Sequence, residues 1–262
     1  MLNLLRSDFY RLFKSKSYYI CTLILAALIA GSAFIMDWAS KQVSAAGGST
    51  VGLSLQDGFS YGISSMFSAS NNPLFMGIII AIFITADFSH GTMKNVVSKG
   101  FARTKIYLSK LITMISAIYI MSVVVFIFGT VSAWIITGKF GSFTASYTGE
   151  ILRMAGIELI LYAALVAIFV MIGMTVRNTG GVIAVNIVGI ISFGPMIYQL
   201  LDYLIKGKIH ISDYGLQNNI MFVNNHLALA TDDIIRAVCV GIGFFLVATA
   251  SGILIFKNSD VK

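Results

Sequence analysis

The sequence predicts an all-α integral membrane protein with six transmembrane helices and an N-terminal amphipathic helix that lies in the membrane interface. Hydrophobic residues make up 57% of the chain and charged residues only 11%, whereas soluble domains carry roughly 25% charged residues. Several uninterrupted apolar runs reach the roughly 18–20 residues that cross a hydrocarbon core. With 262 residues, the chain fits one transmembrane domain over residues 1–262.

The first 16 residues are too polar to span a membrane, but their apolar side chains recur at helical spacing. Polar residues such as Asn3, Ser7 and Arg11 fall largely on the opposite side. This pattern is typical of a helix that lies in the interface with its basic side toward lipid headgroups. A merely basic flank that fixes orientation is the alternative. The apolar positions are Leu2, Leu5, Phe9, Leu12 and Phe13.

Six apolar runs follow, and each is predicted to be a span. The second run contains Pro73 near its start, and the fifth contains Gly194-Pro195, which should kink or break the helix. The sequence RNTGG at 177–181 makes a tight return between the fourth and fifth runs, since glycine permits the required turn conformations. The predicted spans are 18–36, 70–88, 106–136, 151–176, 182–201 and 237–256.

Two polar segments, 37–72 and 202–236, are too long for tight turns. The first is Gly- and Ser-rich, and Phe59, Ile63 and Met66 sit in it at helical spacing. A short amphipathic helix is therefore predicted within 37–72. The sequence leaves the order of the rest of both segments open.

Six spans place both termini on one side of the membrane, and charge indicates which side. About two-thirds of the 18 Lys and Arg residues fall on the terminus side. Loops rich in Lys and Arg near span ends stay in the cytoplasm, so both termini are predicted to be cytoplasmic. The net charge of +7 then fits contacts with anionic lipids better than with nucleic acid. The basic residues of the terminus side are Arg6, Arg11, Lys14, Lys16, Lys94, Lys99, Arg103, Lys105, Lys110, Arg177, Lys257 and Lys262.

The familiar catalytic signatures are missing from the sequence. It has no phosphate-binding G-x-x-x-x-G-K-[ST] loop, no H-E-x-x-H and no G-x-S-x-G, so we expect neither ATP hydrolysis nor other enzyme activity from this chain. His90, His210 and His226 are scattered, which argues against a metal site. Cys21 and Cys239 lie in apolar runs, so no disulfide is expected.

The segment 87–110 connects the second and third spans and carries five basic residues. Gly100 is well placed to end a helix that continues from the second span, and a new helix begins near Arg103. The segment is thus predicted to be a helical elbow, hereafter the elbow. An ordinary basic loop is the alternative.

The elbow also carries a sequence pattern. Ala86-Asp87-Phe88-x-x-Gly91-Thr92-Met93-Lys94-Asn95 is followed by Ser98-Lys99-Gly100 and by Arg103-x-x-Ile106-x-x-Ser109-Lys110. This pattern resembles the permease subunits of ATP-binding-cassette transporters of the type-2 exporter class. The layout of the whole chain agrees with that class, although its acidic position is often Glu rather than Asp87.

The resemblance implies that the elbow is a coupling helix that docks onto a separate ATPase subunit. ATP and Mg²⁺ would then be cofactors of that partner, with none in this chain, and a second permease subunit, the same or similar, would complete a multi-pass transporter of a bacterial plasma membrane. The implied docking residues are Asp87, Gly91, Thr92, Lys94, Asn95, Ser98, Arg103 and, as a secondary cytoplasmic contact, Arg177.

Two polar residues fall inside predicted spans. Glu158 could line a transport pathway, pair with Arg153 on the same helix, or lie near the external interface and extend to water. Asn186 could line the pathway or make an interhelical hydrogen bond, and the hydrogen bond is the commoner role.

The leading function is therefore export of an amphipathic substrate, such as a hydrophobic or antimicrobial peptide, a drug or a lipid-like molecule, driven by a separate ATPase. The runner-up is a stand-alone six-helix channel or an ion-coupled secondary transporter. Such proteins usually place several polar groups at the midplane or contain paired broken helices, and this chain offers only Glu158, Asn186 and Gly194-Pro195.

Overall fold

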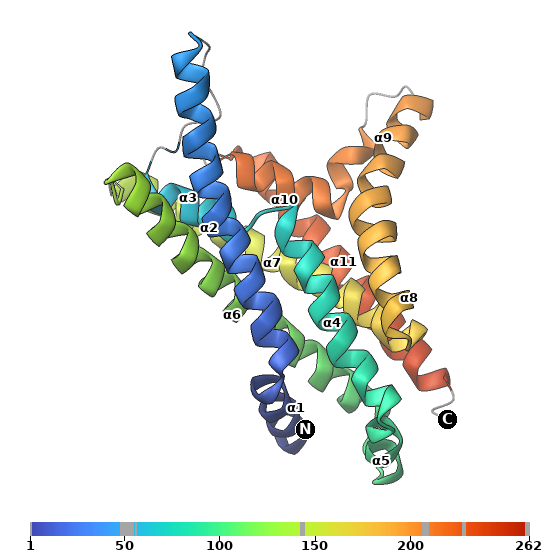
Figure 1. Ribbon diagram of the computed structural model, residues 1–262. Coiled ribbons are helices and arrows are strands. Elements are labelled where there is room, and N and C mark those ends of the chain that lie inside the picture. Colours follow the sequence, from blue (N-terminus) through green and yellow to red (C-terminus); the bar gives the residue numbers. More distant parts are fainter. Residues whose placement is uncertain are drawn as a thin grey trace.

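The computed structural model describes residues 2–47, 55, 57–141, 145–205, 210–226 and 229–259, and all regular structure in these residues is helical (Figure 1). Six of the helical segments are long and apolar enough to cross a membrane. The prediction of an all-α, six-span protein is confirmed.

The N-terminal region consists of α1 (Leu2–Lys14) and α2 (Lys16–Ala45), which meet at Ser15. At about 1.5 Å per residue, the 30 residues of α2 extend roughly 45 Å, which exceeds a hydrocarbon core of about 30 Å. The helix therefore continues well past the predicted end of the first span at residue 36. An ion pair between Lys41 Nζ and Asp37 (2.7 Å) joins two residues one turn apart in this extension.

The short helix predicted in the first polar segment is α3 (Gly58–Met66). Asp57 caps it, because its Oδ1 accepts a hydrogen bond from the Ser60 backbone N–H (2.8 Å). A Cβ at Gly62 would collide with Thr130. Glycine therefore lets α3 pack directly against the long helix that forms the third span.

The second and third spans are α4 (Asn71–Ser89) and α6 (Arg103–Thr137), and the seven-residue α5 (Thr92–Ser98) lies between them. The fourth span is α7 (Ala145–Val176). It is the central element of the core, since α4, α10 and α11 all pack on it (Figure 1). Fully buried side chains along it include Leu161, Tyr162 and Phe169.

The fifth span has three parts: α8 (Thr179–Ala184), a π-helical stretch η1 (Val185–Phe193) and α9 (Gly194–Ile205). The irregularity predicted at Gly194-Pro195 takes the form of the wider π-helical turns just before these residues. Pro195 has no N–H to donate to a carbonyl one turn earlier, which disfavours regular α-helical bonding there.

The second polar segment is also partly ordered, with a 3₁₀ turn η2 (Ile211–Tyr214) and the helix α10 (Leu216–Asn225). The sixth span, α11 (Thr231–Asn258), begins six residues before its predicted start at 237. Gly241 lies against Ile160 and Leu161, which brings α11 close to α7 as small residues do between membrane helices.

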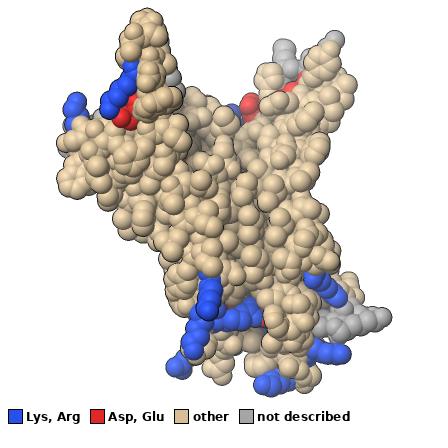
Figure 2. Space-filling model, viewed as in Figure 1, with Lys and Arg blue, Asp and Glu red and all other residues tan. Residues whose placement is uncertain are grey.

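The two ends of the bundle differ in charge. The chain begins and ends at the end that also holds α5, called here the terminus end (Figure 1). Figure 2 shows many Lys and Arg side chains gathered there, whereas the opposite, far end shows fewer basic side chains and some acidic ones. This asymmetry agrees with the basic terminus side expected from the sequence.

Candidate functional site: the elbow and its buried charges

The elbow is a compact turn–helix–turn between two spans. Gly91 (φ +67°) precedes α5 and Gly100 (φ +79°) follows it, and both occupy the left-handed region. Glycine adopts this region without the steric cost that a Cβ brings. The two glycines therefore make the sharp changes of direction at either end of α5.

Thr92 fixes the start of α5 to the end of α4. Its hydroxyl lies 2.9 Å from Asp87 Oδ1 and 3.1 Å from the Asp87 carbonyl oxygen, and it can donate to either. Met93 is buried and packs into the core. Together, the hydrogen bonds and this apolar anchor hold α5 against the bundle.

Four charged side chains from three helices meet beneath α5. Asp87 in α4 is 3% exposed and contacts Arg11 of α1 (Nη2 to Oδ2, 2.8 Å) and Lys110 of α6 (Nζ to Oδ2, 2.7 Å). Lys110 also pairs with Asp8 of α1. This buried charge network (Asp8, Arg11, Asp87 and Lys110) contains two carboxylates and two cations, so its formal charge is zero.

Neutral groups complete the network. Ser109 donates a hydrogen bond to Asp8 Oδ2 (2.7 Å), and the Arg11 guanidinium lies 4.2 Å from the centroid of the Phe83 ring. Burial lowers the pKa of Arg11 and Asp8 opposes that shift. Arginine stays charged in proteins regardless, so Arg11 is a cation that pairs with Asp87.

A cavity of about 210 Å³ lies between α1 and the elbow, directly beside this network. The charged residues that border it are already paired with one another, and the remaining walls are mostly apolar. Its lining residues are Leu4, Ser7, Asp8, Arg11, Asp87, Thr92, Met93, Asn95, Val96, Ile106 and Lys110.

The predicted docking residues separate into an exposed and an inward-facing set. Thr92, Lys94, Asn95 and Ser98 are exposed, whereas Gly91 is half-buried. Asp87 is buried beneath them and cannot form part of a contact surface. The prediction for Asp87 is therefore corrected: its carboxylate holds the elbow in place from below.

Arg103 connects the elbow to the last turn of α11. Its Nη1 donates to the carbonyl oxygens of Lys257 and Ser259 (both 2.7 Å) and of Phe256 (3.2 Å). Carbonyls at a helix C-terminus lack intrahelical donors and carry partial negative charge. The guanidinium thus caps α11 and is half-buried rather than free for a partner.

Arg177 lies beside the elbow, although it is far away in the sequence. Its guanidinium carbon is 5.2 Å from the centroid of the Phe88 ring at the end of α4. The residue adopts a left-handed conformation (φ +58°), and the side chain of the next residue, Asn178, accepts a hydrogen bond from Gly181 N–H (3.3 Å) as the cap of α8. The predicted tight return is thus stabilised by its own side chains.

Sequence reasoning missed Asp8, Ser109 and the role of Lys110 in the buried network. Asp8 lies three residues after Leu5 and four before Leu12, so it falls on the apolar face of the predicted amphipathic helix. An acid at such a position needs a buried cation, and that requirement was the available signal.

The two polar residues inside the spans differ in their surroundings. Asn186 is buried and donates to the Gly77 carbonyl (3.4 Å), which makes it an interhelical contact between η1 and α4. Glu158 is 0% exposed, and neither carboxyl oxygen has a hydrogen-bond partner among the described residues. The alternative in which Glu158 extends to water at the external interface is wrong. No ion pair with Arg153, which is exposed, occurs in the described part of the chain.

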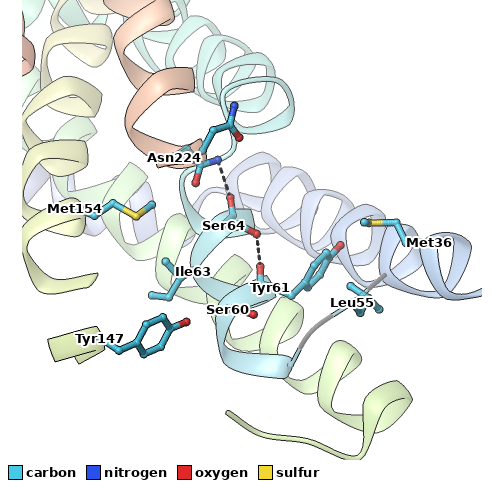
Figure 3. A pocket seen from close by; sticks show the side chains of 10 residues that line it. Met36, Leu55, Ser60, Tyr61, Ile63, Ser64, Tyr147, Met154 and Asn224 are labelled. Atoms are coloured by element: carbon cyan, nitrogen blue, oxygen red, sulfur yellow. Dashed lines mark hydrogen bonds between the residues drawn. The ribbon is translucent and has the colours of Figure 1, made fainter. Parts of the chain in front are cut away.

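A second pocket, of about 270 Å³, opens at the far end (Figure 3). Asn224 donates to the Ser64 carbonyl (3.1 Å) and Ser64 to the Tyr61 carbonyl (3.0 Å) at its wall. Burial raises the pKa of Tyr61. The lining residues are Met36, Leu55, Ser60, Tyr61, Ile63, Ser64, Tyr147, Met154, Asn224 and Asn225.

Within the described ranges, no group of three His, Cys, Asp or Glu residues is placed to hold a metal ion. His90 instead makes a local contact, with Nδ1 2.7 Å from the Ala86 carbonyl oxygen at the end of α4.

These features define a six-span, all-α membrane protein whose second and third spans are joined by a short, anchored helix at the basic end. Its sequence matches a protein family over residues 23–262, and the chain belongs to that family, which is described as "Protein of unknown function (DUF2705)". A search of curated proteins found no significant match.

Proposed function

We propose that this chain is the permease subunit of an ATP-driven exporter and that a separate ATPase subunit docks on its elbow. The observation that carries the proposal is the construction of the elbow. The exposed face of α5 offers Thr92, Lys94, Asn95 and Ser98. Buried Met93 and the hydrogen bonds from Thr92 to Asp87 hold α5 to the bundle, and Asp87 in turn belongs to the buried charge network that joins α1, α4 and α6.

This construction suits the transmission of force. A flexible loop would absorb a displacement of its partner, whereas a short helix anchored at both ends passes it to the spans. Asp87 and Lys110, at opposite ends of the elbow, are joined by a 2.7 Å ion pair. Moving α5 would therefore move α4 and α6 together, as in a rigid-body transition.

The proposal includes an orientation and partners. The terminus end faces the cytoplasm of a bacterial cell, as the excess of Lys and Arg there favours. ATP and Mg²⁺ bind to the ATPase rather than to this chain, and a second permease subunit completes the transporter. The exported substrate is amphipathic, and this choice rests on resemblance to the exporter class alone.

A stand-alone channel or ion-coupled transporter is the second candidate. The observation in its favour is Glu158, an ionisable side chain that is fully buried in a span without a hydrogen-bond partner among the described residues. Substrate transport by this chain in the absence of any ATPase would support this candidate.

Co-purification tests the first candidate. The tagged chain, extracted in mild detergent from its native host, should carry an ATPase polypeptide with it. Lys94→Glu should reduce the bound ATPase at least tenfold, because it reverses an exposed charge at the centre of α5. Lys139→Glu is the matched control: it makes the same charge change at an exposed position of the far end and should leave binding unchanged. Transport without a bound ATPase, or equal loss in both variants, would overturn the proposal.

A further inference from the structure

The interior of the bundle contains a group of buried polar atoms that has an excess of acceptors. Both oxygens of Glu158 and the Oδ1 of Asn72 lack hydrogen-bond partners among the residues that the structure describes, and both side chains are 0% exposed. Buried acceptors without donors are rare, since each is costly in an apolar medium. The group therefore lacks at least one donor.

These acceptors are linked through Tyr162. Asn72 Nδ2 donates to the Tyr162 hydroxyl (3.2 Å), and that hydroxyl donates to the Ser68 carbonyl (3.2 Å). Glu158 precedes Tyr162 by one helical turn on the same face of α7, so the two side chains are neighbours on that face. The donors of Asn72 and Tyr162 are thus used elsewhere, and none reaches the carboxyl group.

The described parts of the surrounding helices supply no counter-charge. From α6, the Tyr119 hydroxyl already donates to the Leu159 carbonyl (2.7 Å). No Lys, Arg or His of α3, α4, α6, α10 or α11 pairs with Glu158 in the part of the chain that the structure describes. An ionised Glu158 would thus be a lone buried charge, which is far costlier than a neutral carboxyl group.

The far-end pocket lies next to this group. On α7, Met154 lines that pocket and lies one helical turn before Glu158. On α3, Ser64 lines the pocket and precedes Ser65. The Ser65 carbonyl accepts a hydrogen bond from Asn72 Nδ2 (3.1 Å). Two separate elements therefore run from the pocket to the acceptor group.

We propose that Glu158 is a proton-binding site inside the membrane domain, neutral in this conformation, and that its proton exchanges through the far-end pocket. One proton supplies the donor that the group lacks. A hard metal cation would need about six or more oxygen ligands, whereas the described residues of this group offer three free acceptors. The inference is independent of whether an ATPase drives the protein.

Carbon-13 NMR of the reconstituted full chain tests the proposal, with the chain made by cell-free synthesis from unlabelled glutamine and from glutamate labelled at the side-chain carboxyl carbon. The sequence contains only two glutamates, Glu150 and Glu158, so Glu150→Gln leaves a single labelled side chain. At pH 7 its resonance should be that of a protonated carboxyl group, and the half-buried Glu150, observed in Glu158→Gln, should give that of a carboxylate. A carboxylate resonance from Glu158 would overturn the proposal.

Two further measurements test the ligand and the route. NaCl should not raise the thermal stability of the wild type more than choline chloride does, and a sodium-specific rise that is absent in Glu158→Gln would identify a cation site instead. Met154→Phe should slow hydrogen–deuterium exchange of the Glu158 carboxyl group severalfold, as followed by its infrared band. Leu152→Phe, at an exposed position of the same helix, is the control. Equal rates in both variants would contradict exchange through the pocket.

Discussion

The substitution Lys110→Met tests whether the buried charge network holds the elbow to the bundle. Lys110 is central because it contacts both carboxylates, and its side chain is only 7% exposed. Methionine keeps most of the volume and all of the apolar stem, so the change removes the charge without opening a large cavity.

The expected loss follows from the partners that remain. Asp8 would keep the Ser109 hydroxyl as its hydrogen-bond donor, and Asp87 would keep Arg11, whose side chain is 36% exposed, and the Thr92 hydroxyl. The site would then carry a net negative charge in a buried position. Breaking a buried ion pair from one side costs about 3–5 kcal/mol, and the remaining donors place this case at about 3 kcal/mol.

Thermal unfolding of the purified chain in detergent measures this loss. A loss of about 3 kcal/mol corresponds to roughly 6–12 °C for a chain of this size. Adding Asp8→Asn to Lys110→Met restores a net charge of zero and should recover most of the stability, to within about 1 kcal/mol of the wild type. Lys105→Met, at an exposed position on the same helix, should change the free energy of unfolding by at most about 0.5 kcal/mol.

Two results would refute this reasoning. If Lys110→Met melted with the wild type, the network would not stabilise the elbow. If the double variant lost more than the sum of the two single changes, charge balance would not be the source of the effect. A double-mutant cycle separates these outcomes, because it isolates the coupling between the two residues.

Three further predictions concern the elbow and its orientation. Gly91→Ala should lower the free energy of unfolding by about 1–2 kcal/mol, because the residue has a left-handed backbone conformation that disfavours a Cβ, although the Cβ would meet no neighbour. Gly91→Asn should cost less, because asparagine tolerates this conformation better. Equal losses in thermal unfolding would argue against backbone strain. Arg103→Gln should speed hydrogen–deuterium exchange at the end of α11, where three carbonyls lose their cationic cap, and unchanged exchange would show that the cap is dispensable. In a Cys21→Ala/Cys239→Ala background, a membrane-impermeant maleimide should label Lys139→Cys on intact cells but Lys94→Cys only after lysis, and the reverse pattern would invert the proposed orientation.

The spans were predictable because an apolar run must be helical in a bilayer, where every backbone polar group has to bond internally. The polar segments were predicted less well. Residues 37–45 extend α2 past the predicted end of the first span, and 216–225 form α10, which packs on α7 and α11. Hydropathy locates the membrane boundary, but a helix can continue past it wherever tertiary contacts or side-chain pairs support it.

The elbow was predictable from its glycines and charges, but its anchoring was not. The contact between Asp8 and Lys110 joins residues that are 102 positions apart, and no local pattern specifies such a pairing. The sequence pattern of the elbow singled out Asp87. Only the three-dimensional arrangement shows that it faces the interior, whereas Lys94 and Asn95, a few residues away, face outward.

The bundle surrounds its buried ionisable groups in two ways, and the contrast bears on which parts can move together. At the terminus end, paired charges join α1, α4 and α6. At the other end of α4, Asn72 bonds to Tyr162 on α7, one turn from Glu158, whose carboxyl group has no hydrogen-bond partner within the described ranges. The same helix therefore connects the elbow to the environment of this carboxyl group. We expect a displacement of α4 by the elbow to alter the Asn72–Tyr162 contact, because it is the described side-chain hydrogen bond that joins α4 to α7. The charge network would remain intact in such a movement, since its members lie on helices that are displaced together.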